Sequence, residues 1–541
     1  YLIKVLKYLI IISIASYVFG LFNTIMEIDA MQYASMSREI LRNDNFLHLF
    51  DNGKPYLDKP PLIFWVTALF FKLLGPSDFV YRLPSTIFTL LLIYSTYRFS
   101  RLFYSKNVSQ IASLILASSE AMFIMNSDVR TDIYMITPMM IAIWHFSEYF
   151  QFNRWKNLII GWIAIAFAMM GKGPIGIVIP LSVLTIDLIF NHRIRNLLDK
   201  RNIVGILVCV LCLLPMSYGL YTQFGFQGLE FFYWTQSFGR ITGESSWSNA
   251  TGPFYLFNVF LYAFLPWTLF SLLALIDRLV DVIKKRHRDK FEIITLAGFI
   301  LPMVILSTSN YKLPHYIYCV IPFASILSAV KLDKWIKNDK YFKRLYVIQL
   351  LLIIAMLILI YGISFFAFGI TLSMVLVPMV LILICYFTLI RLPKEKMLSL
   401  LIPSVIVSVL CSYGLNQGII KPLMEFQSSS KAARFIKDNN YEFSELHLYN
   451  ENSKAKSRSF NFYLDKDIKY IDSDYLKIKS NPKPDLVFTN EEGLRELKNI
   501  DSNFIILQKF DHTRVSKLKP SFINPKTRPK VISKKYLIRF T

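Results

Sequence analysis

The sequence has little charge and little cysteine. Only 18% of its 541 residues are charged and 54% are hydrophobic, whereas soluble domains are about 25% charged. This balance excludes a disordered chain and an ordinary soluble enzyme, and it is typical of a polytopic membrane protein. The five cysteines all lie in apolar stretches. Two of them, Cys209 and Cys212, have the CxxC spacing of a metal or redox pair, but their apolar surroundings favour packed thiols.

Several catalytic motifs are also missing. The sequence contains no HExxH, no Walker A motif and no GxGxxG, and its seven histidines are dispersed along the chain. These motifs are the usual signatures of zinc, nucleotide and dinucleotide sites. We therefore expect no metal site, and a reaction that consumes ATP or a cytosolic nucleotide sugar is disfavoured.

Long hydrophobic runs dominate what is present. A helix needs about 20 apolar residues to cross a membrane. Thirteen runs come close to this length, near 8–22, 84–103, 108–126, 132–150, 157–171, 173–190, 203–222, 254–276, 291–307, 313–330, 345–368, 371–390 and 398–416. We therefore expect a mainly α-helical, polytopic membrane protein with about 13 transmembrane helices. The shorter apolar stretch 62–74 lies between Pro60-Pro61 and Gly75-Pro76, which predicts an interfacial helix along the membrane.

The basic residues agree with this topology. If the N-terminus is cytoplasmic, the rich clusters of Lys and Arg, such as 284–290 and 331–344, fall on the cytoplasmic side, as the positive-inside rule requires. Much of the net charge of +23 is thereby explained without a nucleic-acid partner. The first apolar run is expected to remain as a helix, because no small-residue cleavage site follows it.

The same topology divides the chain into two domains. Residues 1–419 are predicted to form the transmembrane domain, with long outer loops at 23–83 and 223–253. Residues 420–541 are predicted to form a small periplasmic α/β domain, because a helical stretch at 428–439 is followed by β-like runs at 446–449, 485–488 and 504–507. This segment holds 24 Lys and Arg against 15 Asp and Glu, so it carries +9 of the net charge.

Ionisable side chains collect on the predicted outer face. Taken singly, each of these residues can be explained without a function. It can be a charge beside a prolyl helix stop, a helix cap, a lysine that reaches the membrane interface, or a solvated loop residue. Together they suit an anionic lipid head group, because Lys and Arg bind phosphate and a carboxylate can accept a proton from an attacking hydroxyl. The residues are Asp29, Asp58, Lys59, Arg130, Asp132, Lys172, Arg240 and Lys312.

Two segments of the first outer loop resemble a known family. Asp29-Ala-Met-Gln-Tyr33 and Gly53-Lys-Pro-Tyr-Leu-Asp58-Lys59-Pro-Pro-Leu62 are similar to the first outer loop of the GT-C membrane glycosyltransferases. The closest groups are the lipid A aminoarabinose transferases and the protein O-mannosyltransferases. Further matching motifs follow in the family's order over residues 1–330: Arg82-Leu-Pro, Arg130-x-Asp132, Lys172-Gly-Pro, Pro266-Trp267 and Lys312-Leu-Pro-x-Tyr316.

The resemblance implies an inverting glycosyltransferase with the GT-C fold. It implies a polyprenyl-phosphate sugar as donor and an acceptor that is lipid A, another envelope glycolipid or a secreted protein, on the periplasmic side of the bacterial inner membrane. The implied catalytic residues are Asp29 and Asp132, with Asp132 ordering the basic groups. The implied donor-phosphate ligands are Lys59, Arg240 and Lys312, and the other implied active-site residues are Asp58, Tyr33, Arg130, Lys172 and Tyr316.

The sequence also departs from the family pattern. The positions of a Glu and an Arg that often follow the first-loop Asp are Ala30 and Gln32, so one phosphate contact is predicted to be lost or moved. Thr235 and Gln236 stand where the aminoarabinose transferases have a metal-side His, which argues against a metal.

Two other functions compete with transfer. A flippase or transporter would move the lipid-linked sugar without chemistry, and would be expected to carry an internal repeat, which the sequence lacks. An interaction protein would need the spans only as an anchor for residues 420–541, and would need no charged groups at membrane level.

Overall fold

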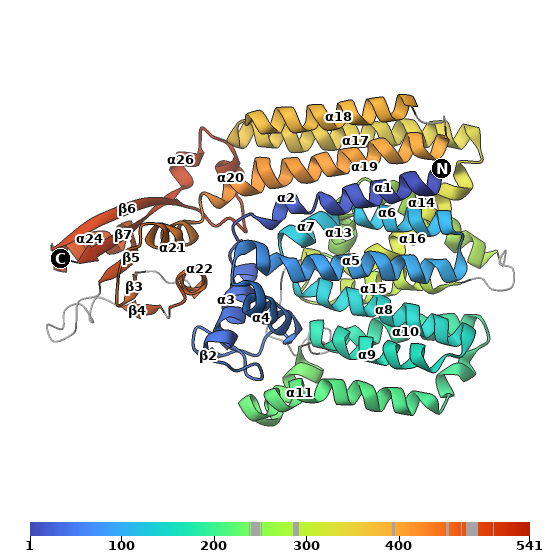
Figure 1. Ribbon diagram of the computed structural model, residues 1–541, viewed down its shortest axis with the longest axis horizontal. Coiled ribbons are helices and arrows are strands. Elements are labelled where there is room, and N and C mark those ends of the chain that lie inside the picture. The colour runs from blue at the N-terminus through green and yellow to red at the C-terminus, as the bar shows by residue number, and fades with distance from the viewer. Residues whose placement is uncertain are drawn as a thin grey trace.

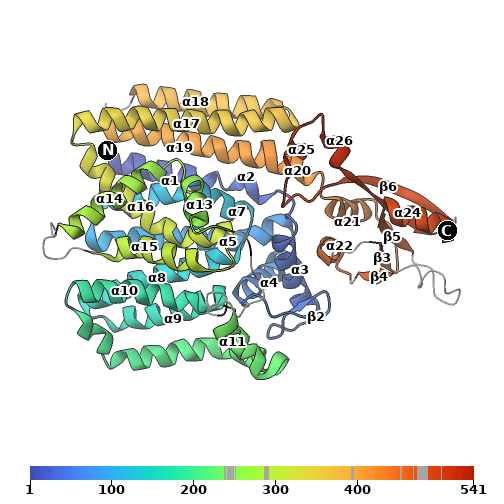
Figure 2. The same ribbon diagram turned by 180° about the vertical axis from the view of Figure 1, so that it is seen from behind.

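The protein is described from a computed structural model. The structure describes residues 1–236, 239, 249, 251–284, 292–391, 395–450, 454–466, 468–471, 485–500 and 503–540. Long helices lie side by side in one bundle, and a small sheet domain stands at one end of it (Figures 1 and 2). The N-terminus lies at the opposite end of the bundle from this domain (Figure 1).

The bundle and its outer loop consist of helices and two very short strands. Their bounds are α1 (Leu2–Ala15), α2 (Val18–Leu21), α3 (Asp29–Arg42), β1 (Phe50–Asp51), β2 (Lys54–Pro55), α4 (Leu62–Leu74), α5 (Asp78–Phe103), α6 (Lys106–Ala117), α7 (Glu120–Ser127), α8 (Thr131–Phe152), α9 (Trp155–Lys172), α10 (Ile175–Phe190), η1 (Ile194–Leu198), α11 (Arg201–Glu230), η2 (Phe231–Thr235), α13 (Tyr255–Ala263), α14 (Thr268–Ile283), α15 (Ile294–Thr308), η3 (Pro314–Val320), α16 (Ile321–Trp335), α17 (Asp339–Phe368), α18 (Leu372–Arg391), α19 (Lys396–Tyr413), η4 (Gly414–Ile420) and α20 (Lys421–Met424).

Helices cover every one of the predicted apolar runs. By length and composition, however, six helices of the described chain can cross a membrane, or seven if α6 and α7 count as one bent span. Four further apolar helices are shorter, among them α10 and α15. The mainly helical, polytopic fold is thus confirmed, whereas the number of 13 spans stays a prediction.

Two of the predicted runs are broken helices whose breaks meet in the core. The first break bends α6 against α7 by 48°, and the second, at Pro266, separates α13 from α14. The indole Nε1 of Trp267 donates to Ser118 Oγ at 3.0 Å, and the backbone N–H of Glu120 donates to the carbonyl oxygen of Leu265 at 3.1 Å. Each break therefore satisfies polar groups that the other exposes, as a low-dielectric interior requires.

The first outer loop forms two helices, of which the sequence predicted the second. Helix α4 covers the predicted stretch 62–74; it begins after two prolines and ends at Gly75, whose φ of 81° suits glycine. Helix α3 packs on α4 through an edge-to-face contact between Tyr33 and Phe64, with ring centroids 5.7 Å apart. Both helices lie at the end of the bundle that faces the sheet domain (Figure 1).

The C-terminal domain is an α/β fold, as the alternating pattern predicted. Its elements are α21 (Ser428–Asp438), β3 (Leu446–Tyr449), α22 (Lys454–Leu464), β4 (Lys469–Ile471), β5 (Leu486–Asn490), α24 (Glu491–Ile500), β6 (Phe504–His512), α25 (Pro520–Ile523), α26 (Arg528–Val531) and β7 (Ser533–Phe540). The strand order is β4-β3-β5-β7-β6. Strand β3 is parallel to β4 and β5, whereas β7 is antiparallel to both of its neighbours.

Polar contacts fix this domain on the first outer loop. The carboxylate of Glu27, which is 8% exposed, accepts hydrogen bonds from the hydroxyls of Ser429 and Ser459. Nearby, Arg434 of α21 forms an ion pair with Asp78 at 2.5 Å. Because an unpaired buried carboxylate is costly, these contacts hold the domain in one position over α3 and α4.

The hairpin of α9 and α10 offers a test of the packing. A Cβ at Gly176 of α10 would come within 2.4 Å of the carbonyl carbon of Ala168 on α9. We expect Gly176→Ala to destabilise the protein by on the order of 1–3 kcal/mol, since the backbone of α9 cannot yield without disturbing its neighbours. In the control Gly362→Ala the new methyl group meets open space, so no loss is expected. Thermal unfolding in one detergent compares the two variants, and equal midpoints would contradict this packing.

Candidate active site

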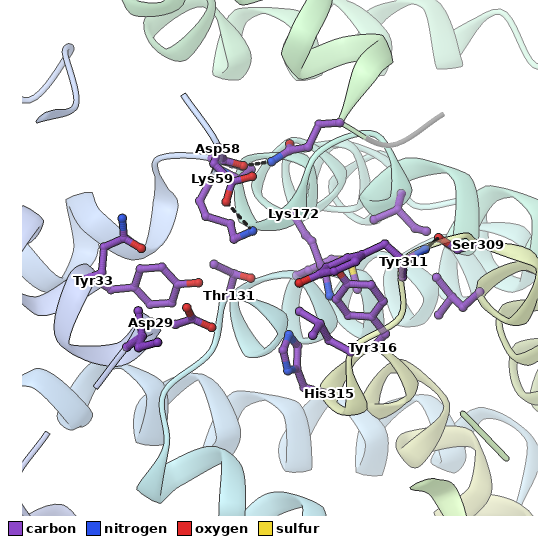
Figure 3. A pocket seen from close by; sticks show the side chains of 18 of the residues that line it. Asp29, Tyr33, Asp58, Lys59, Thr131, Lys172, Ser309, Tyr311, His315 and Tyr316 are labelled. Atoms are coloured by element: carbon purple, nitrogen blue, oxygen red, sulfur yellow. Dashed lines mark hydrogen bonds and ion pairs between the residues drawn. The ribbon is translucent and has the colours of Figure 1, made fainter. Parts of the chain in front are cut away.

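A single cavity of about 470 Å³ brings the outer-face residues together. Its walls come from α3, the segment before α4, the start of α8, the hairpin of α9 and α10, Gln236 after η2, the segment 305–316, and one residue of the C-terminal domain. Among the predicted residues, Asp29, Tyr33, Asp58, Lys59, Lys172 and Tyr316 line it. Figure 3 shows these side chains converging from several elements.

The carboxylate of Asp29 lies at the first residue of α3. It forms an ion pair with Arg130, whose guanidinium also binds Asp128 at 2.6 Å. The Asp29 side chain remains 43% exposed, so one face of the carboxylate is open to the cavity. The side chain of Arg130 fixes this carboxylate in orientation without covering it.

Tyr33 lies one turn further along α3. Its phenol points into the cavity beside Asp29 (Figure 3). Burial, together with the charge of Asp29, raises the pKa of Tyr33 well above its usual value. The phenol therefore stays protonated and can donate a hydrogen bond to a substrate oxygen.

Asp58 and Lys59 lie above Tyr33 and Asp29 in the view of Figure 3. The Lys59 ammonium is 2.8 Å from the Asp58 carboxylate, and the side-chain amide of Gln236 donates to the backbone oxygen of Asp58. The two prolines that follow restrict the backbone. This segment therefore presents a cation to the cavity from a fixed backbone.

A buried ion pair lies behind the cavity wall. Lys172, at the end of α9, donates to Asp132 of α8, whose side chain is 1% exposed. The Lys172 ammonium also lies 4.0 Å from the centre of the Tyr316 ring, a cation–π contact, and His315 Nε2 lies 3.6 Å from Asp132. Lys172, His315 and Tyr316 line the cavity but Asp132 does not. Asp132, predicted to be catalytic, therefore pairs with a residue of the cavity wall without lining the cavity itself.

One of the predicted phosphate ligands, Lys312, does not line the cavity. Lys312 is 6% exposed, and its ammonium donates to the backbone oxygen of Thr251 at 3.2 Å. Its neighbours Tyr311 and Leu313 line the cavity instead. The expectation for Lys312 came from the family resemblance of its motif, which does not say to which side its side chain turns. Arg240 lies outside the described residues.

Sequence reasoning missed several residues of the site. Asp128 and His315 were within reach, because they belong to the same short motifs as Arg130 and Lys312. Arg458 was not, since α22 is more than 400 residues from α3 in sequence, yet Arg458 lines the cavity and binds Asp51. Within the described part of the chain, no three His, Cys, Asp or Glu side chains are grouped so that they could hold a metal ion.

The sequence matches known proteins in part. Residues 58–218 match the family described as dolichyl-phosphate-mannose-protein mannosyltransferase. Undecaprenyl phosphate-alpha-4-amino-4-deoxy-L-arabinose arabinosyl transferase 1 of Pseudomonas fluorescens is 25% identical over 317 residues, which are 57% of this chain and 55% of that protein. The matched part is therefore about half the length of this relative.

The solved structures are similar over almost the whole chain. The crystal structure of ArnT from Cupriavidus metallidurans bound to undecaprenyl phosphate aligns with a TM-score of 0.75, covering 98% of this chain and 97% of ArnT at 17% identity. The chain has the GT-C fold. The archaeal oligosaccharyltransferase AglB from Archaeoglobus fulgidus aligns with a TM-score of 0.51 at 13% identity, covering 90% and 69% of the two chains. The fold expected from the sequence is thus confirmed, including the small C-terminal sheet domain of this GT-C protein.

The contribution of the pair of Asp132 and Lys172 to stability can be tested by removing first one charge and then both. Lys172→Met leaves the Asp132 carboxylate buried without its cation, which we expect to cost about 3–5 kcal/mol. The double variant Asp132→Leu with Lys172→Met removes both charges and is expected to recover most of that loss. Thermal unfolding of the three proteins measures this difference. A double variant no more stable than the single one would show that the pair is not the cause.

Proposed function

We propose that the chain is an inverting glycosyltransferase that moves a sugar from a polyprenyl-phosphate donor to an acceptor on the outer side of the membrane. The observation that carries the proposal is the shared cavity of Asp29 and Lys59. A carboxylate and a cation facing one cavity beside the interfacial helices suit a reaction in which a hydroxyl attacks and a lipid phosphate leaves.

The proposed chemistry has two halves. Asp29 accepts the proton of the acceptor hydroxyl while that oxygen attacks the anomeric carbon of the donor sugar. The bond from this carbon to the phosphate oxygen breaks, and the phosphate leaves with the electron pair. Lys59 stabilises the charge that develops on the phosphate, and Lys172, which also lines the cavity, adds a second cation. Lys172 takes the place first expected for Lys312, while the role of Arg240 stays a prediction.

The donor class is supported by the names of the relatives. The family description names a dolichyl phosphate, the Pseudomonas fluorescens transferase an undecaprenyl phosphate sugar, and the ArnT structure holds undecaprenyl phosphate. We propose the same lipid class here. The proposed acceptor is lipid A, another envelope glycolipid or a secreted protein.

The orientation follows from charge and shape. We propose that the N-terminus is cytoplasmic and that the cavity and the C-terminal domain face the periplasm of a bacterial inner membrane. The basic loops at 284–290 and 331–344 then lie on the cytoplasmic side. The N-terminus and the C-terminal domain stand at opposite ends of the bundle (Figure 1), which agrees with this orientation.

The role of Asp29 can be tested by an isosteric change. Asp29→Asn keeps the size of the side chain but removes the proton acceptor, so we expect transfer to fall by about 10²–10⁴-fold. Asp44→Asn is the matched control, because Asp44 is an exposed residue shortly after the end of α3. Mass spectrometry of envelope lipids and glycoproteins from a deletion strain carrying each variant detects the product. Full activity of a folded Asp29→Asn protein would refute the role of Asp29 as proton acceptor. A wild-type protein that moved the lipid-linked sugar across the membrane without transferring the sugar would favour a flippase.

The role of Lys59 can be tested by binding alone. We expect Lys59→Gln to weaken binding of undecaprenyl phosphate by about tenfold, because a charge-assisted contact to the phosphate is lost. Lys54→Gln, on the exposed strand β2, should leave the affinity unchanged. Titration of the purified proteins in lipid nanodiscs gives both dissociation constants. Equal affinities would remove Lys59 from the donor site.

A further inference from the structure

His315 is a cavity residue that the proposed reaction does not yet use. It is the second residue of η3, its side chain is 16% exposed, and it lines the cavity together with Lys172 and Tyr316. In the view of Figure 3 the imidazole lies between Asp29 and Tyr316. Histidine is the side chain whose charge ordinarily changes near neutral pH, so its presence at a site for phosphate bears on how protons and phosphate bind there.

One carboxylate joins His315 to Lys172. Asp132 accepts a hydrogen bond from the Lys172 ammonium on Oδ1, and its Oδ2 atom lies 3.6 Å from Nε2 of His315. That distance is longer than a hydrogen bond, and contacts of this kind often tighten only when substrate binds. Among the residues that the structure describes, no hydrogen bond reaches Oδ2. Because both oxygens belong to one carboxylate, a phosphate that meets Lys172 also lies next to the imidazole.

In the part of the chain that the structure describes, the charged side chains at the cavity are already paired. The pairs are Asp29 with Arg130, Asp58 with Lys59, Asp132 with Lys172, and Arg458 with Asp51. Of these, Asp132, Lys172, Arg130 and Lys59 lie close enough to act on the imidazole. Helices α13 and α15, which also pack on η3, carry no charged side chain, and neither does the first half of α16. A positive charge on His315 therefore needs a further anion, which a phosphate supplies.

The two forms of the imidazole present different groups to a phosphate. A neutral imidazole has one N–H donor, and with that donor directed to Asp132 its other nitrogen presents a lone pair, which repels a phosphate oxygen. A protonated imidazole has two donors. One of them meets Oδ2 of Asp132, and the other remains for the phosphate. A phosphate contact from His315 therefore requires that a proton binds as well.

We propose that His315 binds the phosphate of the departing polyprenyl phosphate and takes up one proton as it does so. The inference rests on the transferase function proposed above. The phosphodiester of the donor carries one negative charge. The monoester that remains after the bond to the anomeric carbon breaks carries close to two, because its second pKa is about 6.

The step is balanced in protons and in charge. The acceptor hydroxyl gives up one proton, through Asp29, the phosphate oxygen keeps the electron pair of the broken bond, and His315 takes up one proton. The charge gained by the phosphate is therefore compensated inside the cavity, and no proton is released to the solvent while the product is bound. Asp132 is the positioning residue that holds the imidazole.

The test counts protons during lipid binding. The probes are undecaprenyl phosphate, a monoester, and its methyl ester, a diester. The full-length protein in nanodiscs is titrated with each lipid by calorimetry at about pH 7.5, where the monoester is almost fully ionised. Buffers that differ in their enthalpy of ionisation give the number of protons taken up. We expect the wild type to take up about one proton with the monoester and about none with the diester.

Two histidine variants locate the proton. In His315→Gln the uptake with undecaprenyl phosphate should vanish and the affinity should fall by about tenfold, because one charge-assisted contact is lost. Affinity for the methyl ester should stay within about twofold of the wild type, which also shows that the variant is folded. His48→Gln is the matched control, since His48 contacts Thr222 at 2.8 Å and does not line the cavity. Uptake and affinity should be unchanged in this control.

Three results would overturn the inference. Proton uptake that persists in His315→Gln would place the proton on the phosphate or on another residue. Equal uptake with the two lipids in the wild type, including none with either, would separate the proton from the second charge of the phosphate. An equal loss of affinity for both lipids in His315→Gln and His315→Asn would give His315 a packing role. A wild type that binds neither lipid would instead refute the proposed transferase function.

Discussion

Charge beside a membrane has to be paired, and four ion pairs at the cavity, besides that of Arg130 with Asp128, meet this constraint. They are Asp29 with Arg130, Asp58 with Lys59, Asp132 with Lys172, and Asp51 with Arg458. An isolated charge in such surroundings would cost several kcal/mol. Three of the pairs join different elements, so pairing also fixes α3 to the start of α8, α8 to α9, and β1 to α22. The pair of Asp58 and Lys59 is the exception, because its partners are neighbours in the chain and brace nothing else.

Much of this architecture could be predicted from the sequence. Apolar runs and basic loops follow from the bilayer itself, and two prolines and a glycine mark both ends of α4. The number of spans is harder to obtain, because helices such as α10 and α15 are apolar but short. Several breaks also depend on contacts that sequence does not reveal, as when Trp267 reaches Ser118 across the core.

The site was predictable only where its residues share short motifs. The cavity is lined by Asp29, Asp58, Lys59 and Lys172, because the short motifs that contain them lie at its edges. Lys312 shows the limit of this reasoning: the motif reaches the cavity, but its ammonium turns to the backbone of Thr251. Gln32 stands where the family often has an arginine, so a contact to phosphate was expected to be lost or moved. Gln32 donates to Asp51, and a guanidinium enters the cavity beside it from another domain, which no local pattern could indicate.

The position of Arg458 in the chain has a consequence for the assembly of the protein. The other walls of the cavity come from residues 28–316, but one wall is absent until α22 has been synthesised. The binding site is therefore finished late in biogenesis. Until then the ion pair of Asp51 with Arg458 is missing and the cavity lacks its lining residue from α22, so the order of synthesis itself delays completion of the cavity.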